Sequence, residues 1–295
     1  MQPPIGASGA MPQTLGIGRH GDRFKSWMLP EAKKAKQLLY VADNGYALIH
    51  VFSLPSYREV GRIAPGGLGS IERITTDSKG NLYIAWLGGY NITVYAPGKR
   101  TPFLTLTDSH DPDDVAVGAN GYVYAGDVQG GIDVYPPGTA SPTSRLTNSN
   151  LGGAVYGVGV DASNDVYGAG TSAAGVPAVV KFAGASGPGT NLGLKRLIQP
   201  SGVFIDRKKD VVVSDFDAGI LTYPSGKTSP SSMISVQFAE RSGFNARENV
   251  ICVPQGGHNY PLTVFDYPSG NAVKTLQFGN GHNLSGAALS PAPKP

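Results

Sequence analysis

The chain has 295 residues, of which 40% are hydrophobic and 15% charged, and its 24 basic and 21 acidic side chains leave a net charge of +3. This balance argues against a nucleic-acid-binding protein, because such proteins concentrate positive charge on one surface. No stretch approaches the run of roughly 20 apolar residues that crosses a membrane, so we expect no membrane span.

Cysteine usage and the first residues bear on the compartment. Cys252 is the single cysteine, which excludes an intramolecular disulfide, and a lone cysteine in an apolar run is typical of a small core residue. Cysteine-poor chains occur in cytoplasm and periplasm alike. The first residues lack the basic and apolar regions of a signal peptide. The Gly, Ser, Thr and Asn content favours an exported protein, periplasmic or extracellular, without its signal peptide, and we expect a monomer.

Taken in chain order, residues 1–36 lie outside any repeat and are predicted to form an N-terminal arm or strap. Trp27, Met28 and Leu29 would cover the side of the following domain. The simpler alternative is a partly ordered arm that does not pack against the domain.

From residue 37 onward one unit recurs along the chain. It consists of a short apolar strand ending near Asp, a Gly or Asn turn, a second apolar strand and a final Pro-Gly or similar turn. The clearer copies are QLLYVADNGYALIHVFSLPS (37–56), GNLYIAWLGGYNITVYAPG (80–98), NGYVYAGDVQGGIDVYPPG (120–138) and KDVVVSDFDAGILTYPSG (209–226), and weaker copies span 164–184 and 248–270.

A further strand precedes most of these copies and sets the period. These strands end at Asp77, Gly118, Asp161, Asp206, Asn245 and Ser290, with spacings of 41, 43, 45, 39 and 45 residues. Such a period, with four strands to a unit and tight Gly-containing turns, is typical of β-propeller blades. We therefore predict an all-β fold, a six-bladed β-propeller of four-stranded antiparallel blades over 37–290, followed by a tail at 291–295.

The two ends of the repeat predict how the ring closes. The first copy has no inner strand before it, and the last inner strand, Ser285 to Ser290, has no copy after it. We predict that this C-terminal inner strand pairs with the N-terminal strands and completes one blade. Closure of this kind removes free sheet edges.

Two units also carry a family resemblance. GNLYIAWLGGYNITVYAPG and QPSGVFIDRKKDVVVSDFDAGILTYPSG (199–226) follow the pattern Pro-x-Gly-Φ-x-Φ-Asp, a turn, and Φ-Tyr-Φ-x-Asp, where Φ is apolar. In this the chain resembles NHL-type repeats and is similar to the six-bladed SMP-30/gluconolactonase and strictosidine-synthase-like group over roughly 37–290. The resemblance implies the fold, which hosts lactonases, lyases, sensors and scaffolds.

In a propeller, the residues that lead into the inner strands converge at one mouth of the central channel. Each of the six lead-in segments has four residues, as in SIER (70–73). Their third positions hold Glu72, Asp113, Tyr156, Ser201, Glu240 and Ser285, and their fourth positions hold Arg73, Asp114, Gly157, Gly202, Arg241 and Gly286. Buried charges are costly unless they are paired or bound to metal. The predicted ligand-binding residues at this mouth are Arg73, Asp114, Tyr156, Gln199 and Arg241, joined by Trp86 and His258 from outer loops.

Two interpretations of the acidic positions stay open. The resemblance implies that Glu72, Asp113 and Glu240, with Asn283, hold one divalent cation, and Ca²⁺ prefers such oxygen ligands. The family's N-terminal Glu-Gly-Pro-type ligand segment is missing, however, and Glu72 replaces an expected Asn. Alternatively, the acids and arginines form ion pairs that plug the channel.

His110 and His282, which stand near two of the lead-in segments, are the candidate catalytic residues. A histidine beside carboxylates can act as a general base, whereas a loop histidine bonded to water and backbone is the plainer interpretation. The chain lacks G-x-S-x-G, H-E-x-x-H, Walker and C-x-x-C motifs.

These observations favour a binding propeller that holds a small molecule, glycan or peptide at its polar mouth. The alternative is a divalent-metal-dependent hydrolase of the lactonase or esterase type that uses the same residues. A structural interaction disc without a function in its channel is a third hypothesis.

Overall fold

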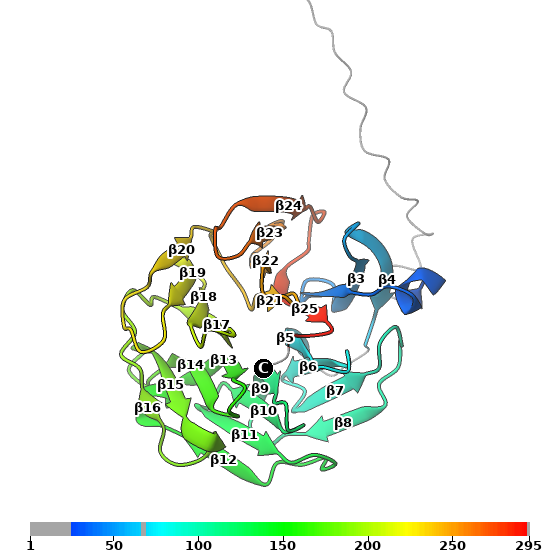
Figure 1. The fold of residues 1–295 in the computed structure, drawn as a ribbon. Helices are drawn as coiled ribbons and strands as arrows, with labels where there is room; N and C mark the ends of the chain where they lie inside the picture. Colours follow the sequence, from blue (N-terminus) through cyan, green and yellow to red (C-terminus); the bar gives the residue numbers. More distant parts are fainter. Residues whose placement is uncertain (1–24, 66–68, 294–295) are drawn as a thin grey trace, which may run out of the picture.

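The structure is a computed structural model that describes residues 25–65 and 69–293. Its strands form six antiparallel sheets arranged as blades around a central axis (Figure 1). This arrangement confirms the predicted six-bladed β-propeller. No helix in the described ranges is long and apolar enough to cross a membrane.

Five blades each contain four consecutive strands, and the first strand of each blade lies nearest the axis (Figure 1). Blade 1 contains β5 (Ser70–Thr76), β6 (Leu82–Leu87), β7 (Asn91–Tyr95) and β8 (Leu104–Thr107). Blade 2 contains β9 (Pro112–Val117), β10 (Val123–Asp127), β11 (Gly131–Tyr135) and β12 (Ser144–Thr147). Blade 3 contains β13 (Ala154–Val160), β14 (Val166–Thr171), β15 (Pro177–Phe182) and β16 (Thr190–Asn191).

The fourth and fifth blades follow the same plan, and short 3-10 turns join some of the strands. Blade 4 contains β17 (Pro200–Ile205), β18 (Val211–Asp215), β19 (Gly219–Tyr223) and β20 (Ser232–Ile234). Blade 5 contains β21 (Gly243–Phe244), β22 (Val250–Pro254), β23 (Leu262–Asp266) and β24 (Ala272–Leu276). The 3-10 turns are η1 (Pro30–Lys33), η2 (Ser149–Leu151) and η3 (Ala183–Ala185).

Blade 6 joins the two ends of the chain, as the repeat predicted. Its inner strand β25 (Leu284–Ser290) pairs antiparallel with β2 (Leu38–Asp43), and the sheet continues through β3 (Leu48–Ser53) and β4 (Arg58–Ile63). Backbone hydrogen bonds between the two ends therefore close the ring.

The N-terminal segment adds one more strand to this blade. β1 (Trp27–Met28) pairs antiparallel with β4, so that Trp27 lies opposite Arg62. Met28 and Leu29 pack against the core between blades 6 and 1. The described part of the predicted strap thus lies against the outer strand of blade 6, and residues 1–24 of it lie outside the described ranges.

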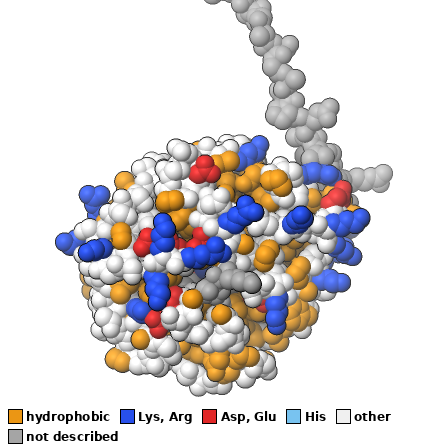
Figure 2. Space-filling model, in the orientation of Figure 1, with side chains coloured by type: hydrophobic (Ala, Val, Ile, Leu, Met, Phe, Trp, Pro, Cys, Tyr) orange, Lys and Arg blue, Asp and Glu red, His pale blue; other side chains and the backbone are white. Residues whose placement is uncertain are grey.

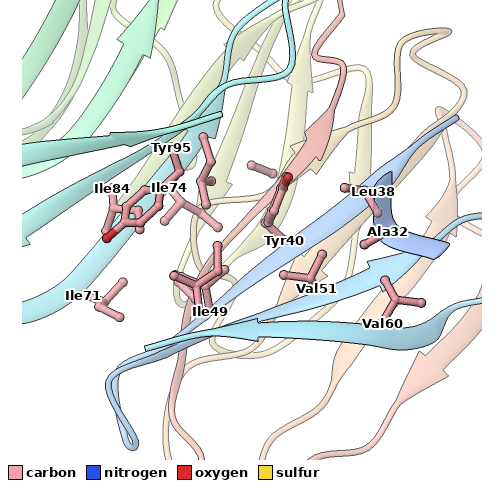
Figure 3. Close-up of a cluster of buried hydrophobic side chains, with 14 of the residues drawn as sticks. Ala32, Leu38, Tyr40, Ile49, Val51, Val60, Ile71, Ile74, Ile84 and Tyr95 are labelled. Carbon is pink, nitrogen blue, oxygen red and sulfur yellow. The ribbon is translucent and has the colours of Figure 1, made fainter. Parts of the chain in front are cut away.

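Six apolar clusters fill the spaces between neighbouring blades, one at each junction. Figure 3 shows the cluster between blades 6 and 1, where Tyr40 and Ile49 from blade 6 face Ile74 and Tyr95 from blade 1. Alternating strand residues point to opposite faces of a blade, so each blade contributes to two clusters. Burial of this apolar surface is the main force that holds the ring together.

The end of the channel at which the inner strands finish carries the C-terminal segment (Figure 1). A cavity of about 80 Å³ there is lined by the ends of inner strands and by Ala292 and Pro293. Figure 2 shows that Lys and Arg side chains outnumber acidic ones on this face. The predicted mouth lies at the opposite end, where the inner strands begin.

Candidate functional site

A β-bulge at the start of the inner strand aims the lead-in residues into the channel. The register of the inner strand shifts by one residue in blades 1, 2, 3, 4 and 6. The residues left without a ladder partner are Glu72 with Arg73, Asp113, Tyr156, Ser201 and Ser285. Bulges re-aim side chains, which explains why the third lead-in positions meet at one mouth.

Arg73 lies at the centre of the resulting cluster, close to the mouth. Its guanidinium pairs with the carboxylates of Asp113, Glu240 (Nη2 to Oε2, 3.1 Å) and Glu72 (Nη1 to Oε2, 3.9 Å). Its Nε donates to the backbone carbonyl oxygen of Ser201 at 3.0 Å. Side chains from blades 1, 2 and 5 and a carbonyl of blade 4 are therefore joined through one guanidinium.

Arg241 forms a second ion pair deeper in the channel. Its Nε lies 2.9 Å from Oδ2 of Asp114, a side chain that is fully buried. The guanidinium also donates to the carbonyl oxygens of Val158 (3.2 Å) and Val203 (3.4 Å), and Asp114 accepts the backbone N–H of Val158 at 2.7 Å. Gly202, at the fourth lead-in position of blade 4, leaves room for the Arg241 side chain, because a Cβ there would lie 2.9 Å from Cδ of Arg241.

The mouth cluster holds more carboxylates than arginines. Burial raises the pKa of Asp113 to about 8, and neighbouring carboxylates add to this rise against the opposing effect of Arg73. Burial also raises the pKa of Glu240. The carboxylates in turn raise the pKa of Arg73, although burial alone would lower it. The cluster therefore carries an excess of negative charge that a proton or another cation can balance.

This excess predicts a pH dependence of stability. The pKa of Asp113 rises from 3.8 to about 8 on folding, so between these values the folded chain holds a proton that the unfolded chain has released. The free energy of unfolding should then fall as the pH rises through this range, by at most about 1.4 kcal/mol per pH unit. Urea unfolding at pH 5 to 9 gives the free energy of unfolding at each pH. This free energy should fall less steeply with pH in Asp113→Asn than in the wild type, and an equally steep fall would contradict the assignment to Asp113.

The metal set implied by the resemblance fits this geometry poorly. Arg73 already supplies positive charge at the point where Glu72, Asp113 and Glu240 converge. A divalent cation held by the same oxygens would face a buried guanidinium at close range, which low-dielectric surroundings make costly. Asn283 is engaged elsewhere, because its Oδ1 accepts the backbone N–H of Gly257 at 2.8 Å.

The other predicted ligand-binding residues lie in varied settings. Tyr156 is half-buried in the bulge of blade 3, and the side chains of Gln199 and His258 are exposed. Trp86 is 1% exposed, and its Nε1 donates to Oγ1 of Thr93 at 2.8 Å. The structure therefore places Trp86 within β6, with its side chain buried in the apolar cluster between blades 6 and 1 and not at the surface of the mouth.

His110 and His282 each lie in a separate polar cluster, one in blade 2 and one in blade 6. His110 Nδ1 lies 2.7 Å from Oδ2 of Asp133, and His282 Nδ1 lies 2.5 Å from Oδ2 of Asp43. Burial would raise the pKa of Asp43, but hydrogen bonds from His282 and His50 outweigh it and hold that pKa below its ordinary value. His50 in β3 and Asp133 in β11 had no predicted role.

Three aromatic side chains at the blade 4 and 5 side of the mouth also had no predicted role. The rings of Phe216 and Phe238 lie 5.1 Å apart, and those of Phe238 and Tyr260 lie 4.8 Å apart. A Cβ added to Gly256 would lie 2.7 Å from Oε1 of Glu240 and 2.9 Å from Cε2 of Phe216. The aromatic trio (Phe216, Phe238 and Tyr260) therefore adjoins the Arg73 cluster.

Comparison with known proteins supports the fold. The family model described as strictosidine synthase-like, N-terminal, matches residues 100–132, and none of the curated proteins matches the chain. A chain of a nidogen/laminin complex is 14% identical with a TM-score of 0.67, over 87% of this chain and 99% of that one. A protein of unknown function from Bacteroides caccae is 12% identical with a TM-score of 0.67, over 86% and 98%.

A third similar structure is hydrazine synthase from Kuenenia stuttgartiensis, which is 12% identical with a TM-score of 0.55, over 72% of this chain and 68% of that one. Likeness at such low identity concerns the fold and does not extend to activity. The chain is a six-bladed β-propeller that resembles the strictosidine synthase-like proteins over residues 100–132.

Proposed function

We propose that this protein is a binding propeller whose mouth takes a cationic group, namely the Lys or Arg side chain of a peptide. The observation that carries the proposal is the imbalance of charge around Arg73. One guanidinium faces the carboxylates of Glu72, Asp113 and Glu240, so the cluster attracts a second positive charge.

Two of these carboxylates are accessible to a ligand. The side chains of Glu72 and Glu240 are 17% and 15% exposed, whereas that of Asp113 is 5% exposed. A cationic side chain that enters the mouth would meet Glu72 and Glu240 first. Its ion pairs would be partly shielded from water, which makes them stronger than pairs on an open surface.

The aromatic trio supports the same class of ligand. Aromatic faces attract ammonium and guanidinium groups, and the attraction grows when the cation is desolvated. Phe216, Phe238 and Tyr260 are half-buried beside Glu240. A cationic side chain that enters here would contact a carboxylate and an aromatic face together.

The metal-dependent hydrolase is the weaker candidate. Its cation would have to displace Arg73 from Asp113 and Glu240. Its general base would be His110 or His282, whose Nδ1 atoms face Asp133 and Asp43 in other clusters. We therefore favour binding without turnover.

Calorimetric titration with matched sets of basic, neutral and acidic peptides tests the proposal. Basic peptides should bind, and Glu240→Gln should weaken them about 5- to 30-fold, which corresponds to about 1–2 kcal/mol. Glu31→Gln, which alters a carboxylate within η1 that is 55% exposed, should leave binding unchanged. Equal affinity for acidic and basic peptides, or no effect of Glu240→Gln, would refute a cation-binding mouth.

A further inference from the structure

Blade 6 contains a buried cluster of imidazoles and carboxylates outside the Arg73 cluster. Asp43 ends β2, His50 lies within β3, Glu59 lies in β4, and His282 immediately precedes Asn283 and the closing strand β25. Asp43 is 0% exposed, His50 is 2% exposed, and the His282 side chain is 17% exposed. Four segments from both ends of the chain thus meet in this cluster.

One oxygen of Asp43 faces both imidazoles. Oδ2 lies 2.5 Å from Nδ1 of His282 and 3.3 Å from Nε2 of His50. All three atoms lie within 4.8 Å of one another. The other oxygen, Oδ1, accepts the backbone N–H groups of Gly45 (3.1 Å) and Asn283 (3.0 Å). These two hydrogen bonds fix the carboxylate with Oδ2 turned toward the histidines.

A second carboxylate, that of Glu59, orients the His50 ring through the nitrogen that does not face Asp43. Nδ1 of His50 lies 2.7 Å from Oε1 of Glu59, and Arg62 donates to Glu59 through Nε (2.7 Å) and Nη2 (2.9 Å). Histidines that bind metal commonly donate their other ring N–H to a carboxylate in this way, which fixes the tautomer and raises the basicity of the ligating nitrogen. His50 therefore has the outer partner of a metal ligand.

Blade 2 carries the equivalent positions and serves as an internal comparison. At the bulge, Asp43 lies opposite Leu284 and Asp127 lies opposite Pro112, and a histidine stands two residues before each partner, His282 and His110. Further along the blades, His50 lies opposite Arg62 and Asp133 lies opposite Arg145.

The two blades balance their charges differently. Arg145 lies 2.6 Å from Asp127 and 3.1 Å from Asp133, so one guanidinium pairs with two carboxylates of the blade 2 cluster, while the third, Asp108, lies 4.0 Å from Nδ1 of His110. In blade 6 the equivalent Arg62 pairs with Glu59, and Asp43 is left facing two imidazoles. Blade 6 thus turns its arginine toward Glu59 and places His50 where blade 2 has Asp133, so that Asp43 faces imidazoles in place of a guanidinium.

A divalent cation offsets the negative charge of this cluster. With neutral imidazoles, Asp43 and Glu59 outweigh Arg62 and leave a net charge of −1, which one divalent cation brings to +1. Tetrahedral zinc with bonds of about 2.0–2.1 Å separates its ligand atoms by roughly 3.3 Å. The 3.3 Å between Nε2 of His50 and Oδ2 of Asp43 matches this separation, whereas Nδ1 of His282, at 2.5 Å from Oδ2, would move away by about 0.8 Å when the ion binds.

We propose that blade 6 binds one divalent transition-metal ion of the zinc class through Oδ2 of Asp43, Nε2 of His50 and Nδ1 of His282. Two imidazoles and one carboxylate suit zinc and cobalt better than Ca²⁺, which prefers oxygen ligands. The ion would lie between Asp43 and the two imidazoles, where hydrogen bonds join them in this structure. Because His282 leads into β25, the bound ion ties the closing strand to β2 and β3 and stabilises the closed ring.

Co²⁺ titration followed by visible absorption, with zinc content measured after dialysis, tests this site. The wild type should take up one equivalent, and His50→Gln and His282→Gln should lose it. Glu59→Gln should weaken binding about 10- to 100-fold, as the loss of an outer carboxylate does. His110→Gln, the matched change in blade 2, should retain one equivalent.

Thermal unfolding with and without chelator provides a second readout. Chelator should lower the melting temperature of the wild type and of His110→Gln but not that of His282→Gln. Circular dichroism identifies any variant that fails to fold, and His282→Gln, on the more exposed ligand, carries the test if His50→Gln does not fold. A wild type that binds no Co²⁺ or Zn²⁺, or a folded His282→Gln that retains one equivalent, would overturn the proposal.

Discussion

Replacing Arg73 with methionine is expected to lower the free energy of unfolding by about 3–5 kcal/mol. The methionine fills much of the volume but leaves the carboxylates of Glu72, Asp113 and Glu240 without their shared partner. Removing one member of a buried ion pair is costly because the remaining charge stays away from water. Urea unfolding of the purified variant at pH 7 measures the loss.

The matched control is Arg58→Met. Arg58 lies 3.7 Å from Glu31, and the two side chains are 48% and 55% exposed. Exposed pairs contribute about 0–1 kcal/mol, so this variant should stay close to the wild type. An Arg73→Met variant as stable as Arg58→Met would mean that Arg73 does not hold the mouth together.

Breaking the deeper pair is expected to have the second-largest effect. Asp114→Leu leaves the Arg241 guanidinium and the backbone N–H of Val158 without their buried acceptor. Arg241→Met leaves the Asp114 carboxylate without its cation. Each variant should lose about 3–5 kcal/mol of unfolding free energy, measured by urea unfolding.

The double variant separates pairing from packing. When both charges are replaced by apolar side chains, neither is left buried and unpaired, so Asp114→Leu/Arg241→Met should lose less than the sum of the single losses by about 1–3 kcal/mol. Losses that add within about 0.5 kcal/mol would show that the two side chains act independently.

The repeat made most of the fold predictable from sequence. Strand period, tight turns and the unmatched strand at each end are local patterns, and they predicted the blades and the pairing of β25 with β2. The mouth was predictable for the same reason. A position such as Asp113 or Tyr156 recurs at one place in each unit, and the bulge there turns the side chain toward the axis.

Ion pairing of the acids and arginines was one of two interpretations, but which side chains pair was not predictable, because the partners come from blades far apart in sequence. Arg73 meets Glu240 across 167 residues, and Arg241 meets Asp114 across 127 residues. Trp86 was predicted in an outer loop near the mouth, yet it lies within β6 and its ring is buried between blades 6 and 1.

The cluster of blade 6 left one trace in the sequence. His50 interrupts the apolar run LIHVF of β3, and it lies opposite Arg62. A polar side chain at a core position needs partners, so His50 marked a buried polar cluster. The identity of those partners, Asp43 and His282, depended on ring closure and therefore on the structure.

Calorimetric titration with Ca²⁺ tests most directly whether Arg73 takes the place of a cation at the mouth. It is best made in the His282→Gln background, which removes the site proposed in blade 6. We expect no stoichiometric binding of Ca²⁺, and the heat released on Ca²⁺ addition should be the same with and without the Glu240→Gln change. One equivalent of Ca²⁺, bound by the parent and lost on Glu240→Gln or Asp113→Asn, would contradict it and would favour a metal-dependent hydrolase.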